Sequence, residues 1–103
     1  MRDPRVVGLS PEELQRLLES EEIVLVDVRE PAEREIVAIA GSELIPKNEF
    51  LLGNALESLP QDKPVVLYCK VGGRSAEVLA VVKGAGFANA QHVGGGVVAW
   101  VNQ

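Results

Sequence analysis

The sequence predicts a single α/β domain with a central, mainly parallel sheet of about five strands that is flanked by helices on both faces. Three observations lead to this prediction. Short β-branched runs at 23–28 and 65–68 are almost entirely apolar, so both faces of each strand are expected to be buried. Segments with helical patterning lie between such runs, as they do in βαβ units. A chain of 103 residues has the size of one domain.

The first helix is marked by a local signal near the N-terminus. We expect residues 1–8 to form a flexible segment and residues 9–103 to form the domain. Ser10 is followed by Pro11 and then by Glu13, which is the pattern of a capping box with proline at the first helical position. Leucines at positions 14, 17 and 18 give this helix an apolar face.

The elements that follow are predicted from similar signals. After the strand at 23–28, Pro31 begins a short helix at 32–36. The stretch 37–46 is ambiguous and reads as a loop with a brief strand inside it. The later elements are a brief strand at 43–45, a helix capped by Asn48 and running through Leu56, a strand at 65–68, a helix at 75–85 that ends at Gly86, a strand at 90–93 and a terminal helix at 97–101.

Composition argues against several classes of function. A net charge of −5 is unlike the basic surface of a nucleic-acid-binding protein, so no nucleic-acid partner is expected. No apolar stretch approaches the ~20 residues of a transmembrane helix, and no signal peptide opens the chain, so no membrane partner is expected. A single cysteine cannot form an internal disulfide, and a reducing cytoplasm is therefore the expected location.

Cys69 stands where a buried strand meets a glycine-rich loop and a helix. The residues after it are Lys70-Val71-Gly72-Gly73-Arg74. Two successive glycines can adopt positive φ, which lets neighbouring N–H groups converge on the sulfur. Ser75 is a good N-cap residue, and the helix that starts there adds partial positive charge. These features favour the thiolate, the reactive form of cysteine, over an inert buried thiol.

The rest of the sequence limits what one activated cysteine can do. A thiol–disulfide oxidoreductase needs a second cysteine, and a cysteine hydrolase needs an imidazole base. The only histidine, His92, is far along the chain and is interpreted as a strand-end residue with a local hydrogen bond. No His/Cys cluster predicts a metal site, and no cofactor is expected. Two uses remain open: the nucleophile of a cysteine-based phosphatase, and a sulfur carrier that holds a persulfide.

Three motifs resemble those of a known family. They are Leu25-Val26-Asp27-Val28-Arg29-Glu30, Cys69-Lys70-Val71-Gly72-Gly73-Arg74-Ser75-Ala76 and His92-Val93-Gly94-Gly95-Gly96-Val97-Val98-Ala99-Trp100. In this order they resemble the Asp-Val-Arg-Glu strand end, the active loop and the Gly-Gly-x-x-x-Trp ending of rhodanese-type sulfurtransferases, and Glu33 matches the acidic residue after the first motif. The resemblance covers most of the chain from residue 9 onward. It departs from the family at 38–44, which replaces the usual Gly-His-Ile-Pro-Gly-Ala stretch.

Loop length distinguishes members of the wider fold. Four residues stand between Cys69 and Arg74, as in rhodaneses, whereas the related phosphatases and arsenate reductases have five. The shorter loop favours sulfur over phosphate or arsenate. Segments 43–47 and 69–77 also resemble the C-terminal rhodanese domain of molybdopterin-synthase and thiamine-type adenylyltransferase/sulfurtransferases. This resemblance is compatible with a stand-alone rhodanese and with an excised domain of such an enzyme.

The resemblance implies that Cys69 carries sulfane sulfur as a persulfide. Its donor would be a small anion such as thiosulfate, or a persulfide supplied by a cysteine desulfurase, and its acceptor a nucleophile such as a ubiquitin-like sulfur-carrier protein. Lys70 and Arg74 are expected to attract the anionic donor. The backbone amides from Val71 to Ser75, which include those of Gly72 and Gly73, are expected to stabilise the charge on sulfur.

Asp27, Arg29 and Glu33 are expected to support the site, because the carboxyl ends of parallel strands meet at one edge of a sheet. Asp27 is interpreted as a structural residue that binds loop amides, or as a group that orients Arg29. Arg29 either pairs with Glu33 or helps to bind an anionic donor. Two other functions stay open: a cysteine-based phosphatase or arsenate reductase, and a non-catalytic binding module with the rhodanese fold.

Overall fold

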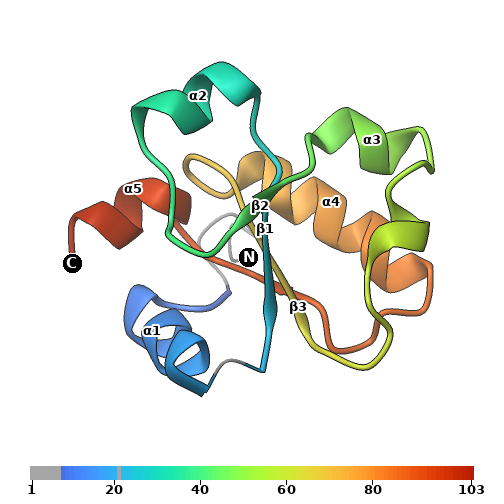
Figure 1. Cartoon of the computed structure of the whole chain (residues 1–103), viewed down its shortest axis with the longest axis horizontal. Coiled ribbons are helices and arrows are strands. Elements are labelled where there is room, and N and C mark those ends of the chain that lie inside the picture. Colours follow the sequence, from blue (N-terminus) through green and yellow to red (C-terminus); the bar gives the residue numbers. More distant parts are fainter. Residues whose placement is uncertain (1–7, 21) are drawn as a thin grey trace, which may run out of the picture.

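A computed structural model describes residues 8–20 and 22–103. At its centre is a four-stranded sheet in the order β2-β1-β3-β4, and each neighbouring pair of strands is parallel (Figure 1). The strands are β1 (Val24–Asp27), β2 (Glu43–Leu44), β3 (Val65–Tyr68) and β4 (Gln91–His92). Because β1 and β3 are central and parallel, their carboxyl ends bring residues 27–29 and 68–70 to the same edge of the sheet.

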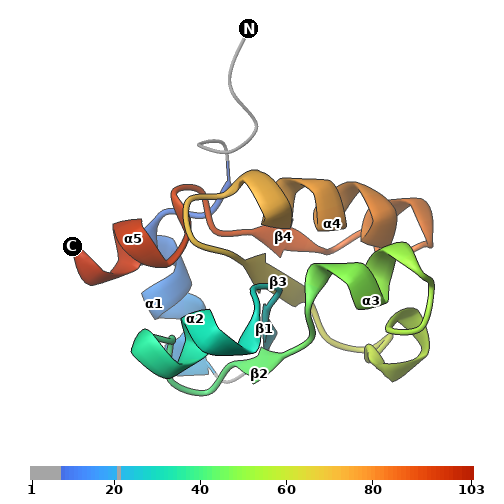
Figure 2. The same ribbon diagram turned by 90° about the horizontal axis from the view of Figure 1, so that it is seen from above.

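Helices cover both faces of this sheet, as the sequence predicts. The helices are α1 (Pro11–Ser20), α2 (Pro31–Ile36), α3 (Lys47–Leu51), α4 (Gly73–Gly84) and α5 (Gly96–Val101), with a 3-10 turn η1 at Leu56–Ser58. Figure 2 shows α1 and α5 on one side of the sheet and α3 and α4 on the other. No helix within the described residues combines the length and apolar character needed to cross a membrane.

Alternate side chains of the central strands pack on opposite faces of the sheet. Leu25, Val66 and Tyr68 belong to the apolar cluster that includes residues of α1 and α5. Val26 and Leu67 belong to the second cluster, which includes residues of α3 and α4. This two-residue alternation, with apolar side chains on both faces, explains why residues 24–26 and 65–67 of the central strands are all apolar.

The prediction of about five strands is wrong by one. Among the described residues, the only pairing beyond β4 is a single parallel bridge between Leu9 and Val93. The Leu9 amide donates to the His92 carbonyl at 2.9 Å, and the Gly94 amide donates to the Leu9 carbonyl at 3.0 Å. Strand pairing after Leu9 ends there, because Ser10 begins the predicted capping box of α1. In this box the Ser10 side chain accepts from the Glu13 amide, and the Glu13 side chain accepts from the Ser10 amide. The expected flexible segment 1–8 lies, except for Gly8, outside the described residues.

Two predicted helix boundaries also need correction. The third helix follows Pro46 directly, without Asn48 as its cap, and ends at Leu51 because Gly53 takes a positive φ of 83°. The helix after the cysteine begins at Gly73, and its N-cap is Gly72 instead of Ser75. The Ser75 hydroxyl is directed at side chains of the site, where it has a different set of partners.

Candidate active site

The Cys69 sulfur sits in a cradle made by the loop that follows β3. The Gly72 amide donates to Sγ at 3.1 Å and the Ser75 amide donates to it at 3.3 Å. Gly72 can aim its N–H inward because it adopts a φ of 112°, which side-chain-bearing residues rarely do. Of the amides from Val71 to Ser75, these two are the ones that bind sulfur. Cys69 itself is only 1% exposed, so the amide donors replace water around a buried, charge-accepting atom.

The N-terminus of α5 holds this loop from behind. The Val97 amide donates to the Cys69 carbonyl at 2.9 Å, and the Val98 amide donates to the Lys70 carbonyl at 3.1 Å. Gly96 lies so close that a Cβ added to it would collide with the carbonyl oxygens of Lys70 and Cys69. The glycine run of the third motif therefore serves the cysteine loop directly, since only glycine permits this approach between backbones.

Arg74 is not an unpaired cation beside the sulfur, because its guanidinium binds a carboxylate. Its guanidinium forms two hydrogen bonds with the Glu33 carboxylate, at 2.6 and 2.8 Å. The Glu33 side chain also accepts from the Glu30 amide, so it caps α2 while it binds the loop. The ion pair lowers the pKa of Glu33 to about 2, because Arg74 donates to its charged form. Lys70, by contrast, is exposed beside the cradle.

Asp27 and Arg29 form a buried pair beneath the site. The Asp27 carboxylate accepts from the Arg29 backbone amide at 3.0 Å and from its guanidinium at two points, each 2.9 Å. The guanidinium also donates to the Val37 carbonyl. Asp27 is 0% exposed and Arg29 is 2% exposed, so both charged groups are almost fully removed from solvent. Asp27 thus both binds a backbone amide and orients Arg29, whose guanidinium donates to Asp27 and Val37 instead of Glu33. Binding of an anionic donor by Arg29 stays a prediction.

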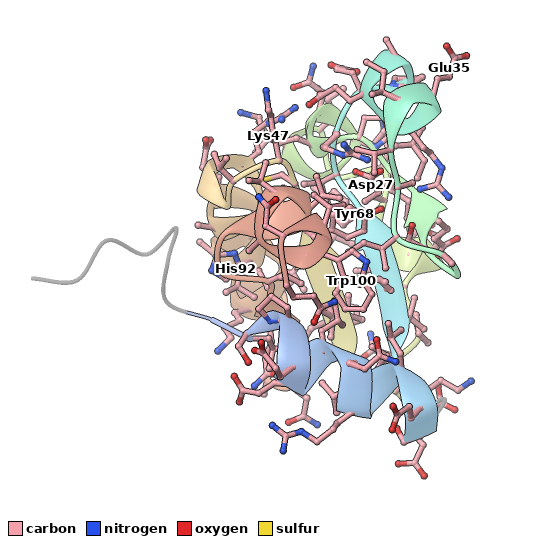
Figure 3. All side chains as sticks on the ribbon, turned by 90° about the vertical axis from the view of Figure 1, so that its left-hand side faces the viewer. Asp27, Glu35, Lys47, Tyr68, His92 and Trp100 are labelled. Atoms are coloured by element: carbon pink, nitrogen blue, oxygen red, sulfur yellow. The ribbon has the colours of Figure 1, made fainter. Side chains whose placement is uncertain are left out.

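Further donors complete this buried network. The Tyr68 hydroxyl, at the end of β3, donates to Asp27 at 3.2 Å and lies 2.8 Å from the Ser42 hydroxyl. Arg34 reaches Asp27 at 3.3 Å. Figure 3 shows Asp27 and Tyr68 next to each other inside the molecule. The network ties the ends of β1 and β3 together, which fixes the strand that carries Cys69.

Sequence reasoning missed the role of His92. Its Nδ1 atom lies 2.9 Å from the Ser75 hydroxyl, and that hydroxyl lies 3.5 Å from the Cys69 sulfur. The hydrogen bond is not local, because β4 places His92 beside β3 although seventeen positions separate it from Ser75. Only the sheet order brings these residues together, and no sequence signal announces it.

An apolar groove borders the cysteine loop. Its wall includes Ile36 at the end of α2, Val37 directly after it, Val98 and Val101 of α5, the exposed Lys70, and the charged residues Arg29 and Glu33. The groove has a volume of about 180 Å³. Ile36 is 86% exposed and Val101 is 55% exposed, which is unusual for side chains of this size clustered at one place. Among the described residues, no cluster of three or more His, Cys, Asp or Glu side chains could hold a metal ion.

The fold and the site together define a class: a parallel α/β domain in which a cysteine at the end of a central strand accepts hydrogen bonds from two amides of the loop that follows it. Comparison with known proteins agrees. Residues 10–103 match the Rhodanese family, described as the rhodanese-like domain. The chain therefore belongs to the rhodanese-like family.

Two curated relatives are informative. The chain is 52% identical over 96 residues to the probable adenylyltransferase/sulfurtransferase MoeZ of Mycobacterium tuberculosis; the match covers 92% of this chain and 24% of MoeZ, so the chain spans about a quarter of that protein. It is 34% identical over 86 residues to a sulfurtransferase of Allochromatium vinosum, with 84% of this chain and 78% of the relative covered.

A solved structure shows the same architecture at full length. The human single-domain sulfurtransferase TSTD1 superposes with a TM-score of 0.79 at 26% identity, and the match covers 99% of this chain and 98% of that one. The MoeZ match agrees with the resemblance to adenylyltransferase/sulfurtransferases noted in the sequence.

Proposed function

We propose that this domain is a sulfurtransferase that carries sulfane sulfur on Cys69. The observation that carries the proposal is the cradle, in which the Gly72 and Ser75 amides donate to Sγ at 3.1 and 3.3 Å. Such donors favour a negatively charged sulfur, which is needed both for attack as a thiolate and for storage as a persulfide. Family membership and the sulfurtransferase relatives support this assignment.

The reaction proceeds in two displacements. The Cys69 thiolate attacks the outer sulfur of thiosulfate; the S–S bond of thiosulfate breaks, and sulfite leaves with the electron pair. The new S–S bond, about 2.05 Å long, places the transferred sulfur one atom beyond the buried Sγ. A nucleophilic acceptor then attacks that outer sulfur, and the electron pair of the broken bond returns to Cys69 as thiolate. Cyanide used as acceptor gives thiocyanate.

A protein acceptor fits the surroundings of the cysteine better than a small molecule alone does. The apolar groove beside Lys70 exposes Ile36 and Val101, which a small hydrophilic acceptor would not use. The 52% identity to part of a probable adenylyltransferase/sulfurtransferase supports an acceptor of the ubiquitin-like sulfur-carrier type, in molybdopterin or thiamine-type biosynthesis. A cysteine desulfurase is the matching protein donor. We place this chemistry in the cytoplasm.

Intact-mass spectrometry tests the central claim directly. Thiosulfate should add the mass of one sulfur atom to the wild-type chain, and a reducing agent should remove it. Cys69→Ser should show no addition and form no thiocyanate, because a hydroxyl does not ionise at neutral pH as a thiol does. Circular dichroism of the variant controls for folding. Wild-type protein that stays unmodified but hydrolyses an aryl phosphate would support the phosphatase reading, and inert wild-type protein would support a binding module.

A further inference from the structure

A continuous hydrogen-bonded path leads from the cysteine to the histidine inside the domain. The Cys69 sulfur lies 3.5 Å from the Ser75 hydroxyl, which lies 2.9 Å from Nδ1 of His92. Ser75 is 0% exposed and His92 is 2% exposed, so water does not interrupt the path. The three residues come from different elements: the end of β3, the first turn of α4, and β4.

The serine hydroxyl has only one hydrogen to donate. The protonation state of Cys69 and that of His92 are therefore coupled, because they compete for this hydrogen. When Cys69 is a thiol, Sγ–H donates to the Ser75 oxygen, and the serine hydrogen is given to an unprotonated Nδ1. When Cys69 is a thiolate, the serine hydrogen turns to the sulfur, and Nδ1 donates to the serine oxygen only if it carries a proton. The Gly72 carbonyl, 3.3 Å from the hydroxyl, is a longer and weaker alternative acceptor.

We propose that His92 is a positioning residue that acts on Cys69 through Ser75, taking up at Nδ1 the proton that the thiol loses. The Sγ–H bond breaks and its electron pair stays on sulfur. The Ser75 oxygen receives that proton and passes its own hydrogen to Nδ1, so the step changes no oxidation state. The proposal rests on the proposed function for its biological use, since the thiolate starts the sulfur transfer.

His92 lies next to the surface of the domain although its side chain is buried. His92 borders an open surface pocket of about 360 Å³. The charged groups that line this pocket with it are Glu13 of α1 and Lys83 of α4, which have opposite sign. Cys69, at the end of β3, is linked to the histidine through Ser75. The path therefore runs from the buried sulfur to a residue that lines a surface pocket.

The test exploits the presence of one cysteine and one histidine in the chain. The rate of alkylation by iodoacetamide, followed by intact mass across a pH series, reports the thiolate of Cys69 alone. His92→Asn keeps an amide that can bond Ser75 but cannot take up a proton. We expect its rate–pH curve to move up by about one pH unit, which is about a tenfold slower alkylation on the acid side. Gln91→Ala, at the exposed neighbour on β4, is the matched control and should leave the curve in place.

Ser75→Ala should shift the curve in the same direction, and the double variant should add little, because both changes break one path. Superimposable curves for wild type and His92→Asn would overturn the proposal, as would full additivity. If a variant fails to fold, the wild-type histidine ring can be titrated by NMR before and after alkylation of Cys69. Coupling is reciprocal, so the midpoint must move, and an unmoved midpoint rejects the path. Neither readout needs sulfur transfer, so a chain that takes no sulfur from thiosulfate would refute the proposed function alone.

Discussion

Arg74 and Glu33 form a bidentate ion pair, with nitrogen–oxygen distances of 2.6 and 2.8 Å, that fastens the cysteine loop to the start of α2. Each side chain keeps about 30% exposure, so the pair stands at the edge of the site. The guanidinium that the motif suggests as an anion-binding group is thus occupied in holding the loop in shape. Lys70, by contrast, is an exposed cation beside the same loop.

The ion pair predicts a stability that depends on pH. The folded-state pKa of Glu33 is lowered from 4.5 to about 2, chiefly by the hydrogen bonds from Arg74. The stabilisation is therefore complete above pH 4.5 and is lost as the pH falls toward about 2. Solvent screens this partly exposed pair, so Glu33→Gln should cost about 1 kcal/mol at neutral pH and close to nothing at the acid end.

Urea denaturation at a series of pH values measures this difference. Glu35→Gln, an exposed position on the same helix, is the matched control and should change the free energy of unfolding little (Figure 3). A loss in Glu33→Gln that is equal at every pH would contradict the prediction, because it would come from the helix cap instead of the ion pair.

Because Lys70 is an exposed cation beside the cysteine loop, we expect the affinity for an anionic donor to depend on salt concentration. Lys70→Gln should raise KM for thiosulfate about threefold at low ionic strength, and salt should reduce the difference. We expect kcat to change little, because Lys70 does not contact the sulfur. Lys63→Gln, at the opposite end of β3, should leave KM unchanged. Equal effects of the two variants would show that net charge, not the local cation, governs binding.

At Gly96, the effect of an added side chain on packing can be measured separately from its effect on backbone conformation. Both Gly96 and Gly53 have positive φ, at 60° and 83°, but a Cβ would collide only at Gly96, since nothing lies within 4 Å of Gly53. Alanine at either position costs about 1–2 kcal/mol for the left-handed backbone. Gly96→Ala should cost about 1–3 kcal/mol more, because the collision displaces the loop.

Thermal unfolding and persulfide loading of the two glycine variants measure the outcome together. Gly96→Ala should load sulfur at least about tenfold more slowly than Gly53→Ala, a difference of about 1.4 kcal/mol in the barrier. Identical loading rates would mean that α5 does not hold the cradle.

The buried network predicts a large stability effect from one atom. Asp27→Asn leaves the 2%-exposed Arg29 without its counter-charge, which should cost about 3–5 kcal/mol in the free energy of unfolding. Tyr68→Phe removes one hydroxyl from the same network and should cost about 1–3 kcal/mol, so it stays measurable if the first variant does not fold. Denaturant titration of both variants checks the order; a neutral Asp27→Asn would show that the network contributes little.

The sequence by itself predicts most of the elements, the cysteine loop and the edge of the sheet at which it lies. These follow from local rules: apolar runs form buried strands, Ser10 and Glu13 cap a helix, and the positive φ of Gly72 lets an amide turn toward the sulfur. Gly73, for which the sequence also suggests a positive φ, does not adopt one. The boundaries that were wrong depend on competition between neighbouring signals. Ser75 has the sequence signal of a helix N-cap, but in the structure its hydroxyl bonds to His92, which β4 brings near it.

Only the tertiary structure decided which charged and polar groups pair. From its place in the sequence, Arg29 could pair with either Glu33 or Asp27. In the structure it pairs with Asp27, because a buried guanidinium needs a carboxylate that is buried beside it. His92 meets Ser75 because β4 lies beside β3, an order of strands that no local pattern encodes. Local sequence fixes conformation over a few residues, whereas partners that are far apart in the chain are set by how the layers pack.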